Sequence, residues 1–144
     1  MRQKQKGFTL LEVLVAMVVL SIGLLGLAGL MGASMRNNQS SSQRTQAAWL
    51  AYDVIDRMRV NRTAAVAAAN NYNTPITAST STSTGLAGTD INDWKATLAN
   101  ALPAGAGSVA VTALTGATRV VIRWNDSRGT GGNNAQTVTV DTQL

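Results

Sequence analysis

The chain has few of the side chains that usually carry catalysis. It contains no cysteine and no histidine, so thiolate nucleophiles, disulfides and the most common metal ligand and general base are missing. Its seven Asp and Glu residues are scattered, and none forms a recognisable acid–base pair. We therefore expect no catalytic residue, no cofactor and no metal site, and a protein that is not an enzyme.

One carboxylate nevertheless has an unusual setting. Glu12 precedes the uncharged run Val13–Met35. As a helix this run would extend about 34 Å, which exceeds the ~30 Å hydrocarbon core of a bilayer. The bases Arg2, Lys4 and Lys6 lie before it. Because positive charges tend to stay in the cytoplasm, the sequence predicts a single membrane span with a cytoplasmic N-terminus and a translocated remainder.

Three kinds of N-terminal segment have a basic start and an apolar run. A secretory signal has a shorter apolar core, and here the possible small-residue site Gly32-x-Ser34 lies beyond a full span. A plain signal anchor fits the length but gives no reason for Glu12, since a charge costs ~2.5–3.5 kcal/mol at the centre of a membrane helix. The cost is smaller near the helix end, but a partner is still needed. The third kind provides one.

The residues Gly7-Phe8-Thr9-Leu10-Leu11-Glu12 resemble the class III signal of type IV pilins and type II secretion pseudopilins. The resemblance implies cleavage by prepilin peptidase between Gly7 and Phe8, followed by N-methylation of Phe8. It also implies that the new terminal ammonium and the Glu12 carboxylate neutralise each other and help an incoming subunit to dock. Glu12 would thus carry an assembly charge.

This resemblance predicts four segments along the chain. They are a prepilin leader at residues 1–7, a transmembrane and filament-core helix at 8–35, the outer half of the same helix at 36–69, and a small periplasmic head at 70–144. Glycine recurs at every third residue from Gly23 to Gly32. This spacing fits close packing between membrane helices or a helical segment that loosens in the filament.

Apolar residues return at helical spacing after a polar stretch. Ala47, Leu50, Ala51, Val54 and Met58 fall on one side of a helix, with Ile55 beside them. We expect one long helix from Phe8 to about Ala68, whose outer half packs one face on the head. Asp53 and Arg57 are spaced for an i,i+4 ion pair.

The segment Asp56–Arg62 is by itself typical of a solvated helix face. It also resembles the Asp-Arg-Met-Arg-x-Asn stretch of the minor pilins known as type IV pilus modification protein PilV. Asp93-Trp94, Leu102-Pro103 and Val120–Trp124 resemble the same group. Major pilins often have a C-terminal region bounded by a disulfide, so the absence of cysteine favours a minor subunit.

The head is predicted to be α+β. Residues Asn70–Thr89 show almost no apolar pattern and include the hydroxyl-rich run Ser79–Thr84, which indicates a long mobile surface loop. Thr89 or Asp90 would cap a short helix that ends at Pro103 and Gly105. Its apolar face would consist of Ile91, Trp94, Leu98 and Leu102.

Three strands are expected to close the chain as an antiparallel meander against the long helix: Val109–Leu114, Thr118–Trp124 and Thr137–Val140. Alternation predicts that Val120, Ile122 and Trp124 form the core face of the middle strand, and that Val138 and Val140 face inward from the last.

The resemblance implies a minor pilin that contacts membrane lipid first and then enters a type IV pilus or its tip. Its partners would be prepilin peptidase, other minor and major pilins, and the inner-membrane assembly platform. The alternatives are a minor I-type pseudopilin of type II secretion and a signal-anchored periplasmic binding module. A nucleic-acid partner is not expected, because Arg2, Lys4 and Lys6 contribute three of the 12 basic residues and no basic cluster with interleaved aromatics occurs elsewhere.

Overall fold

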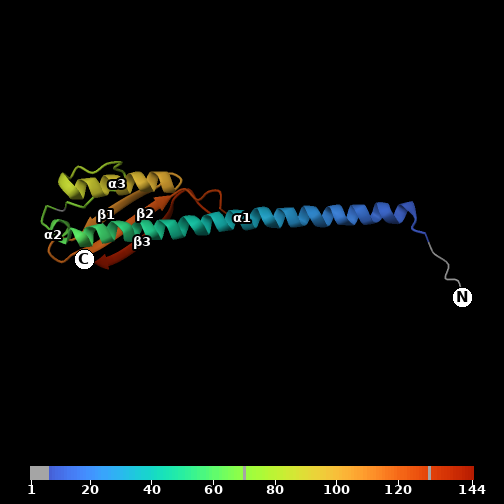
Figure 1. The fold of residues 1–144 in the computed structure, drawn as a ribbon, viewed down its shortest axis with the longest axis horizontal. Coiled ribbons are helices and arrows are strands. Elements are labelled where there is room, and N and C mark those ends of the chain that lie inside the picture. Colours follow the sequence, from blue (N-terminus) through green and yellow to red (C-terminus); the bar gives the residue numbers. More distant parts are fainter. Residues whose placement is uncertain (1–6, 70, 130) are drawn as a thin grey trace. The chain divides into compact units, whose positions relative to one another are not determined.

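The computed structural model describes residues 7–69, 71–129 and 131–144 (Figure 1). Its elements are α1 (Leu10–Val60), α2 (Arg62–Ala65), α3 (Gly85–Ala101), β1 (Ala106–Val111), β2 (Ala117–Trp124) and β3 (Gln136–Gln143). The chain divides into two compact units, one up to Arg36 and one from Asn37 to Leu144. Helix α1 contributes to both. The basic positions 2, 4 and 6 of the predicted leader lie outside the described residues.

The predicted α+β architecture is confirmed in the second unit. The strands form an antiparallel sheet in the order β1-β2-β3, and Val120 lies opposite Val109 on one side and Val140 on the other. Alternation decides which face is buried. Val120, Ile122 and Trp124 are completely buried, as expected. Val138 and Val140 of β3 are partly buried against the same core.

The outer part of α1 and the helix α3 cover this face of the sheet (Figure 1). The predicted apolar stripe of α1 packs against this face. Five of its residues are buried: Ala47, Ala51, Val54, Ile55 and Met58. Leu50 is partly buried. Trp94 of α3 is fully buried, and its indole N–H donates to the Leu50 carbonyl at 2.8 Å. Each large apolar side chain removed from water contributes about 1.5–3 kcal/mol. The predicted position of Trp94 on the buried face of its helix is confirmed.

The prediction that α1 continues to Ala68 is wrong. The helix ends at Val60 because Asn61 leaves the helical region, with φ −109° and ψ 42°, and α2 begins anew after it. Asn61 donates its side-chain amide to the Tyr72 hydroxyl at 3.1 Å. Asparagine is favoured at such breaks because its side chain competes with helical hydrogen bonding.

The predicted start of the next helix is wrong, and the loop before it is shorter than expected because residues 85–89 belong to α3. Helix α3 begins at Gly85 after the N-cap residue Thr84, and not at Thr89 or Asp90. The preceding segment is anchored, since Tyr72 is completely buried and Thr74 forms a bridge with Val109. Asn70 itself lies outside the described residues.

The first and last strands differ in extent from the prediction. Strand β1 lies three residues earlier than expected, because Leu114 has a φ of +67° and Gly107 passes under α3. A Cβ at Gly107 would lie 2.4 Å from Trp94 Cη2, so only glycine fits there. Strand β3 continues beyond Val140 to Gln143, because β2 pairs with it along its whole length.

Candidate processing and assembly site

Helix α1 has a defined start next to the predicted processing site. The backbone N–H of Glu12 donates to Thr9 Oγ1 at 3.3 Å and to the Thr9 carbonyl at 3.1 Å. Thr9 therefore caps the helix, and Glu12 falls in its first turn. The Thr-x-x-Glu spacing is that of a capping box, of which the structure shows the Thr9 half; our sequence interpretation missed this signal. The positive end of the helix dipole favours the carboxylate at this position.

The two residues at the predicted cleavage point lie outside this helix. Gly7 and Phe8 have no regular secondary structure, and the Phe8 side chain is 83% exposed. An added Cβ at Gly7 would meet no atom within 4 Å. The peptide bond between them is therefore free of helical hydrogen bonding and of covering side chains in the part of the chain described.

The exposed Glu12 carboxylate lies beside apolar side chains. A shallow groove along the first turns of α1 is lined by Phe8, Glu12, Val13, Ala16, Met17 and Leu20. The surface of this groove is almost entirely apolar apart from Glu12. Few polar groups of the lining residues would therefore compete with this carboxylate for an approaching cation.

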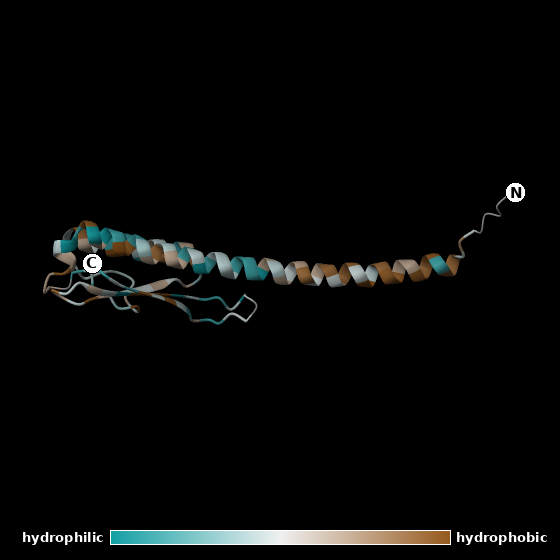
Figure 2. Ribbon diagram, turned by 90° about the horizontal axis from the view of Figure 1, so that it is seen from below, coloured by the Kyte–Doolittle hydropathy of each residue, from teal (hydrophilic) through white to brown (hydrophobic). Residues whose placement is uncertain are grey.

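The helix that carries this groove is long and apolar enough to cross a membrane, judged by length and composition. Its most apolar 18-residue window has a mean hydropathy of 2.6 and is not buried in the protein. Figure 2 shows the hydrophobic residues concentrated in the first part of α1. At Gly23, Gly26, Gly29 and Gly32, no atom lies within 4 Å of an added Cβ. No contact of the described chain requires these glycines.

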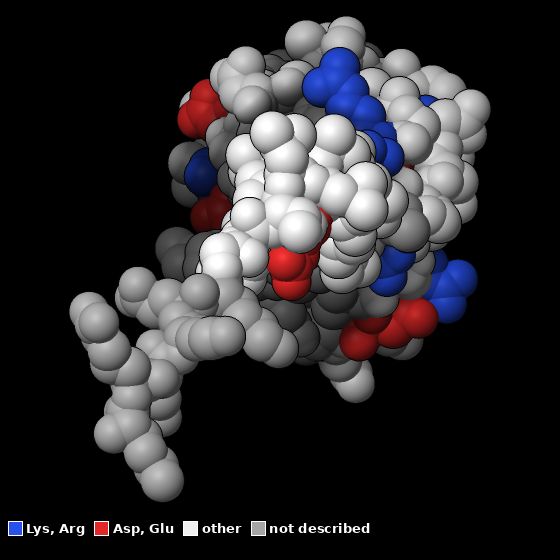
Figure 3. Space-filling view, turned by 90° about the vertical axis from the view of Figure 1, so that its right-hand side faces the viewer, with Lys and Arg blue, Asp and Glu red and all other residues white. Residues whose placement is uncertain are grey.

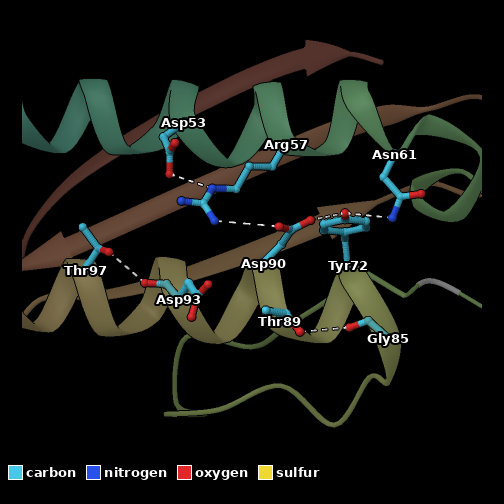
Figure 4. Close-up of polar contacts among 9 residues, drawn as sticks. All are labelled: Asp53, Arg57, Asn61, Tyr72, Gly85, Thr89, Asp90, Asp93 and Thr97. Carbon is cyan, nitrogen blue, oxygen red and sulfur yellow. Dashed lines mark hydrogen bonds and ion pairs between the residues drawn. The ribbon is translucent and has the colours of Figure 1, made fainter.

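A second polar cluster joins the end of α1 to the head (Figure 4). Arg57 Nε donates to Asp53 at 3.0 Å, which confirms the predicted ion pair, and its guanidinium lies 3.8 Å from Asp90. The Tyr72 hydroxyl donates to Asp90 at 2.5 Å and accepts from Asn61. Burial, together with the hydrogen bond to Asp90, raises the pKa of Tyr72 to about 12.

This cluster explains part of the Asp56–Arg62 segment. The solvated-face interpretation holds for Asp56 and Arg59, which are exposed and form an ion pair at 2.9 Å. It is wrong for Met58, which is completely buried, and for Arg57, which joins the cluster. These residues fix the end of the helix on the head, which is a structural role.

Charges on the remaining surface do not gather into one basic region on the face that Figure 3 shows, where Lys and Arg side chains lie among acidic and uncharged ones. In residues 7–69, 71–129 and 131–144, no group of three or more His, Cys, Asp or Glu side chains could hold a metal ion.

The comparison with protein families points to the N-terminal segment of the chain. A family model described as the prokaryotic N-terminal methylation motif matches residues 2–28, which include Gly7, Phe8 and Glu12. Neither the curated proteins nor the solved structures gave a match. The motif is structural and does not define an enzyme family. It implies processing by prepilin peptidase and assembly with other pilins, and the apolar helix suggests membrane anchoring. The matched motif thus supports a protein of the pilin or pseudopilin type.

Proposed function

We propose that the chain is a minor pilin, a structural subunit that takes part in the initiation or biogenesis of a type IV pilus. The observation that carries this proposal is the methylation motif at residues 2–28, which runs into an exposed apolar helix. Residues 1–7 would form the leader, 8–35 the membrane and filament-core helix, 36–69 the outer helical region and 70–144 the periplasmic head.

Processing would take place at the cytoplasmic end of the span. Prepilin peptidase hydrolyses the peptide bond between Gly7 and Phe8, where the glycine offers no side chain to obstruct the enzyme. The leader departs with Gly7 as its C-terminal carboxylate, and the free amine of Phe8 receives a methyl group. A methylated secondary amine stays protonated near neutral pH, so the positive charge of the terminus is kept.

Glu12 would then pair with such a terminus during assembly. An opposite charge at ~4 Å contributes about 4 kcal/mol of attraction at an effective dielectric constant of ~20, and more where water is excluded. The side chains around Glu12 are apolar, so lipid or a neighbouring helix packed against them would exclude water from the pair. The helix would leave the lipid of the inner membrane with this charge neutralised by a neighbouring subunit.

Among minor pilins, we favour the PilV group. Arg57, Met58 and Asn61 of the shared segment hold α1 on the head, which gives this segment a reason to be the same in similar subunits. The chain also lacks the cysteines of many major pilins. The alternative is a minor I-type pseudopilin of type II secretion, which has the same kind of N-terminus. Neighbouring genes of the pilus or of the secretion machine distinguish the two.

Mass spectrometry of the mature N-terminus tests the proposal. Protein isolated from cells that contain prepilin peptidase should begin at N-methyl-Phe8. The variant Gly7→Leu should keep its leader, because the added side chain obstructs the scissile bond. Gly23→Ala should be processed normally, since no described residue crowds position 23 and it is remote from the scissile bond in sequence. An intact leader on the unmodified chain would contradict the proposal.

A further inference from the structure

The outer edge of β1 is covered by the chain itself. The backbone of Thr74 exchanges two hydrogen bonds of 3.0 Å with Val109. Next to it, the Asn73 side chain accepts from the Val111 N–H at 2.6 Å and donates to the Val111 carbonyl at 3.3 Å. The segment before α3 therefore acts as a short additional strand at this edge.

Lys95 fixes the covering segment in place. Its buried ammonium donates to the carbonyls of Pro75 (2.9 Å), Ala78 and Gly107 (3.2 Å). Gly107 belongs to β1, so this one side chain joins the segment to the strand that it covers. Burial lowers the pKa of Lys95. The β1 edge is thus closed by hydrogen bonds from both backbone and side-chain groups.

The same bonds determine which groups of β3 point outward. Because Val109 uses its N–H and C=O on Thr74, its pair with Val120 is of the non-hydrogen-bonded type. Successive residues of a strand direct these groups to opposite sides. Val120 therefore bonds across to Val140, and the even-numbered residues of β3 are those that bond to β2.

Two hydrogen bonds at the far end of the sheet give the same alternation. The Thr112 N–H donates to the Ala117 carbonyl at 2.8 Å, and the Leu144 N–H donates to the Gly116 carbonyl at 3.0 Å. Every second residue of β3 must then direct its N–H and C=O away from the sheet. These residues are Thr137, Thr139, Asp141 and Gln143.

This outer edge of β3 is open. Among the described residues, none donates to or accepts from these outward backbone groups, and all four side chains are exposed. Strand β3 has neither a proline nor a lysine, which commonly protect free edges. Its one charge, Asp141, is already paired with Arg119 at 2.7 Å. A long strand edge without such protection is a template for another strand.

We propose that the free edge of β3 binds an extended segment from the head of a different pilin-type subunit, which adds as a fourth strand. This inference rests on the proposed function, since it assumes assembly with other pilins. The β1 edge shows what such an edge accepts in this molecule: a strand-like backbone with alternating donors and acceptors. Backbone hydrogen bonds would supply the affinity, and the exposed threonines of β3 would contact alternate side chains of the partner.

A second copy of this chain is a poorer occupant. Its β1 edge is already covered, so of the two sheet edges in the described residues β3 alone is available. An antiparallel β3–β3 pair would be related by a two-fold axis that reverses the direction of the outer part of α1, which lies along the sheet (Figure 1). Helices that all start in one membrane run in the same direction. We therefore assign the edge to a different subunit that offers an extended head segment, and we treat a second copy as an outcome of the test.

Cross-linking tests the identity of the occupant. The chain has no cysteine, so a photo-cross-linker can be attached to a single new thiol in the full-length protein. We expect Thr139→Cys to give adducts with an extended head segment of another pilin-type subunit. The control Ala110→Cys, on the same sheet face but on the covered β1 strand, should give none. An adduct with a second copy, an adduct with an unrelated protein, or no adduct would overturn the inference.

A backbone variant separates this inference from the proposed function. Thr139→Pro removes one outward N–H without removing a bond to β2, whereas Thr139→Val keeps it. We expect about tenfold less Thr139→Pro than Thr139→Val protein in sheared pili, with N-methyl-Phe8 in both. Equal incorporation of the two would overturn the inference and leave the proposed function intact.

Hydrogen exchange of the unmodified protein covers the case in which the proline variant does not fold. The amides of Thr139 and Asp141 should exchange faster than that of Val140 in detergent, and should become protected in pili. Persistent fast exchange in pili would contradict the inference.

Discussion

At the scale of single residues, Glu12 has two separable features. Its backbone N–H takes part in the cap formed by Thr9, and its side chain is the one charge among the described residues that line an apolar groove. A change of side chain leaves the cap intact, because the cap uses main-chain atoms of Glu12 and the hydroxyl of Thr9. The helix start and the assembly charge can therefore be tested independently.

We expect Glu12→Ala and Glu12→Gln to be cleaved and methylated at Phe8 but to enter pili poorly. Both variants lose the negative charge, whereas Glu12→Asp keeps it on a shorter side chain and should recover part of the incorporation. The measurement is a quantitative blot of sheared pili beside mass spectrometry of the membrane fraction. Asp56→Ala, which removes an exposed charge from the same helix, serves as the control. Normal incorporation of Glu12→Gln would remove the support for charge pairing.

The Tyr72 hydroxyl is the basis of a second prediction at this scale. It donates to Asp90, and its pKa in the folded protein is about 12 against an ordinary value of 10.0. A raised pKa means that the folded state holds this proton more tightly than the unfolded state. The resulting stabilisation is complete below pH 10 and is lost as the pH rises through 12.

Ultraviolet titration of the Tyr52→Phe variant measures this directly, since Tyr72 is then the remaining tyrosine. The phenolate should appear with a midpoint near 12. Adding Asp90→Asn should lower this midpoint, because the asparagine carries no negative charge beside the hydroxyl. Adding Asp93→Asn, an exposed position on the same helix, should leave it unchanged. A midpoint of 10 in Tyr52→Phe would show that the described cluster does not form.

At the scale of elements, hydrophobic periodicity correctly predicted which face of a helix or strand packs into the core. The buried stripe of α1 and the core face of β2 follow directly from spacings of about 3.6 and 2 residues. The boundaries depend on contacts between distant residues and were missed. Helix α1 ends where Asn61 reaches Tyr72, and β1 begins early because Gly107 passes below Trp94. No local pattern records either contact.

The candidate site was more readable than the head, because its signals are local. Gly7, Phe8 and Glu12 belong to one short motif, and the Thr9 cap is recognisable from its Thr-x-x-Glu spacing even though we overlooked it. The anchoring of Thr74 to β1 could not be read in advance. Its segment is polar, and a backbone bridge leaves no trace in the hydropathy pattern.

At the scale of the whole molecule, the two units differ in what satisfies their apolar side chains. The unit from Asn37 onward has its own core, centred on Trp94 and Trp124. The unit up to Arg36 has apolar side chains that are exposed along its helix, such as Leu25 at 74%. An exposed apolar surface of this extent needs lipid or other protein chains around it. We therefore expect this helix to be in contact with lipid or with other subunits.

The last prediction concerns the glycines of this helix. Alanine at Gly26 and Gly29 would meet no atom of the described chain, yet each replacement favours the helical state by about 1 kcal/mol. If the helix must loosen on leaving the membrane, Gly26→Ala/Gly29→Ala should be inserted and methylated normally but should enter pili less efficiently. Val19→Ile, which adds a methylene without removing glycine, should assemble as the unmodified chain does. A filament reconstruction decides the cause: we expect broken helical hydrogen bonds within Ser21–Leu30, and a regular helix there would attribute the effect to close packing between helices.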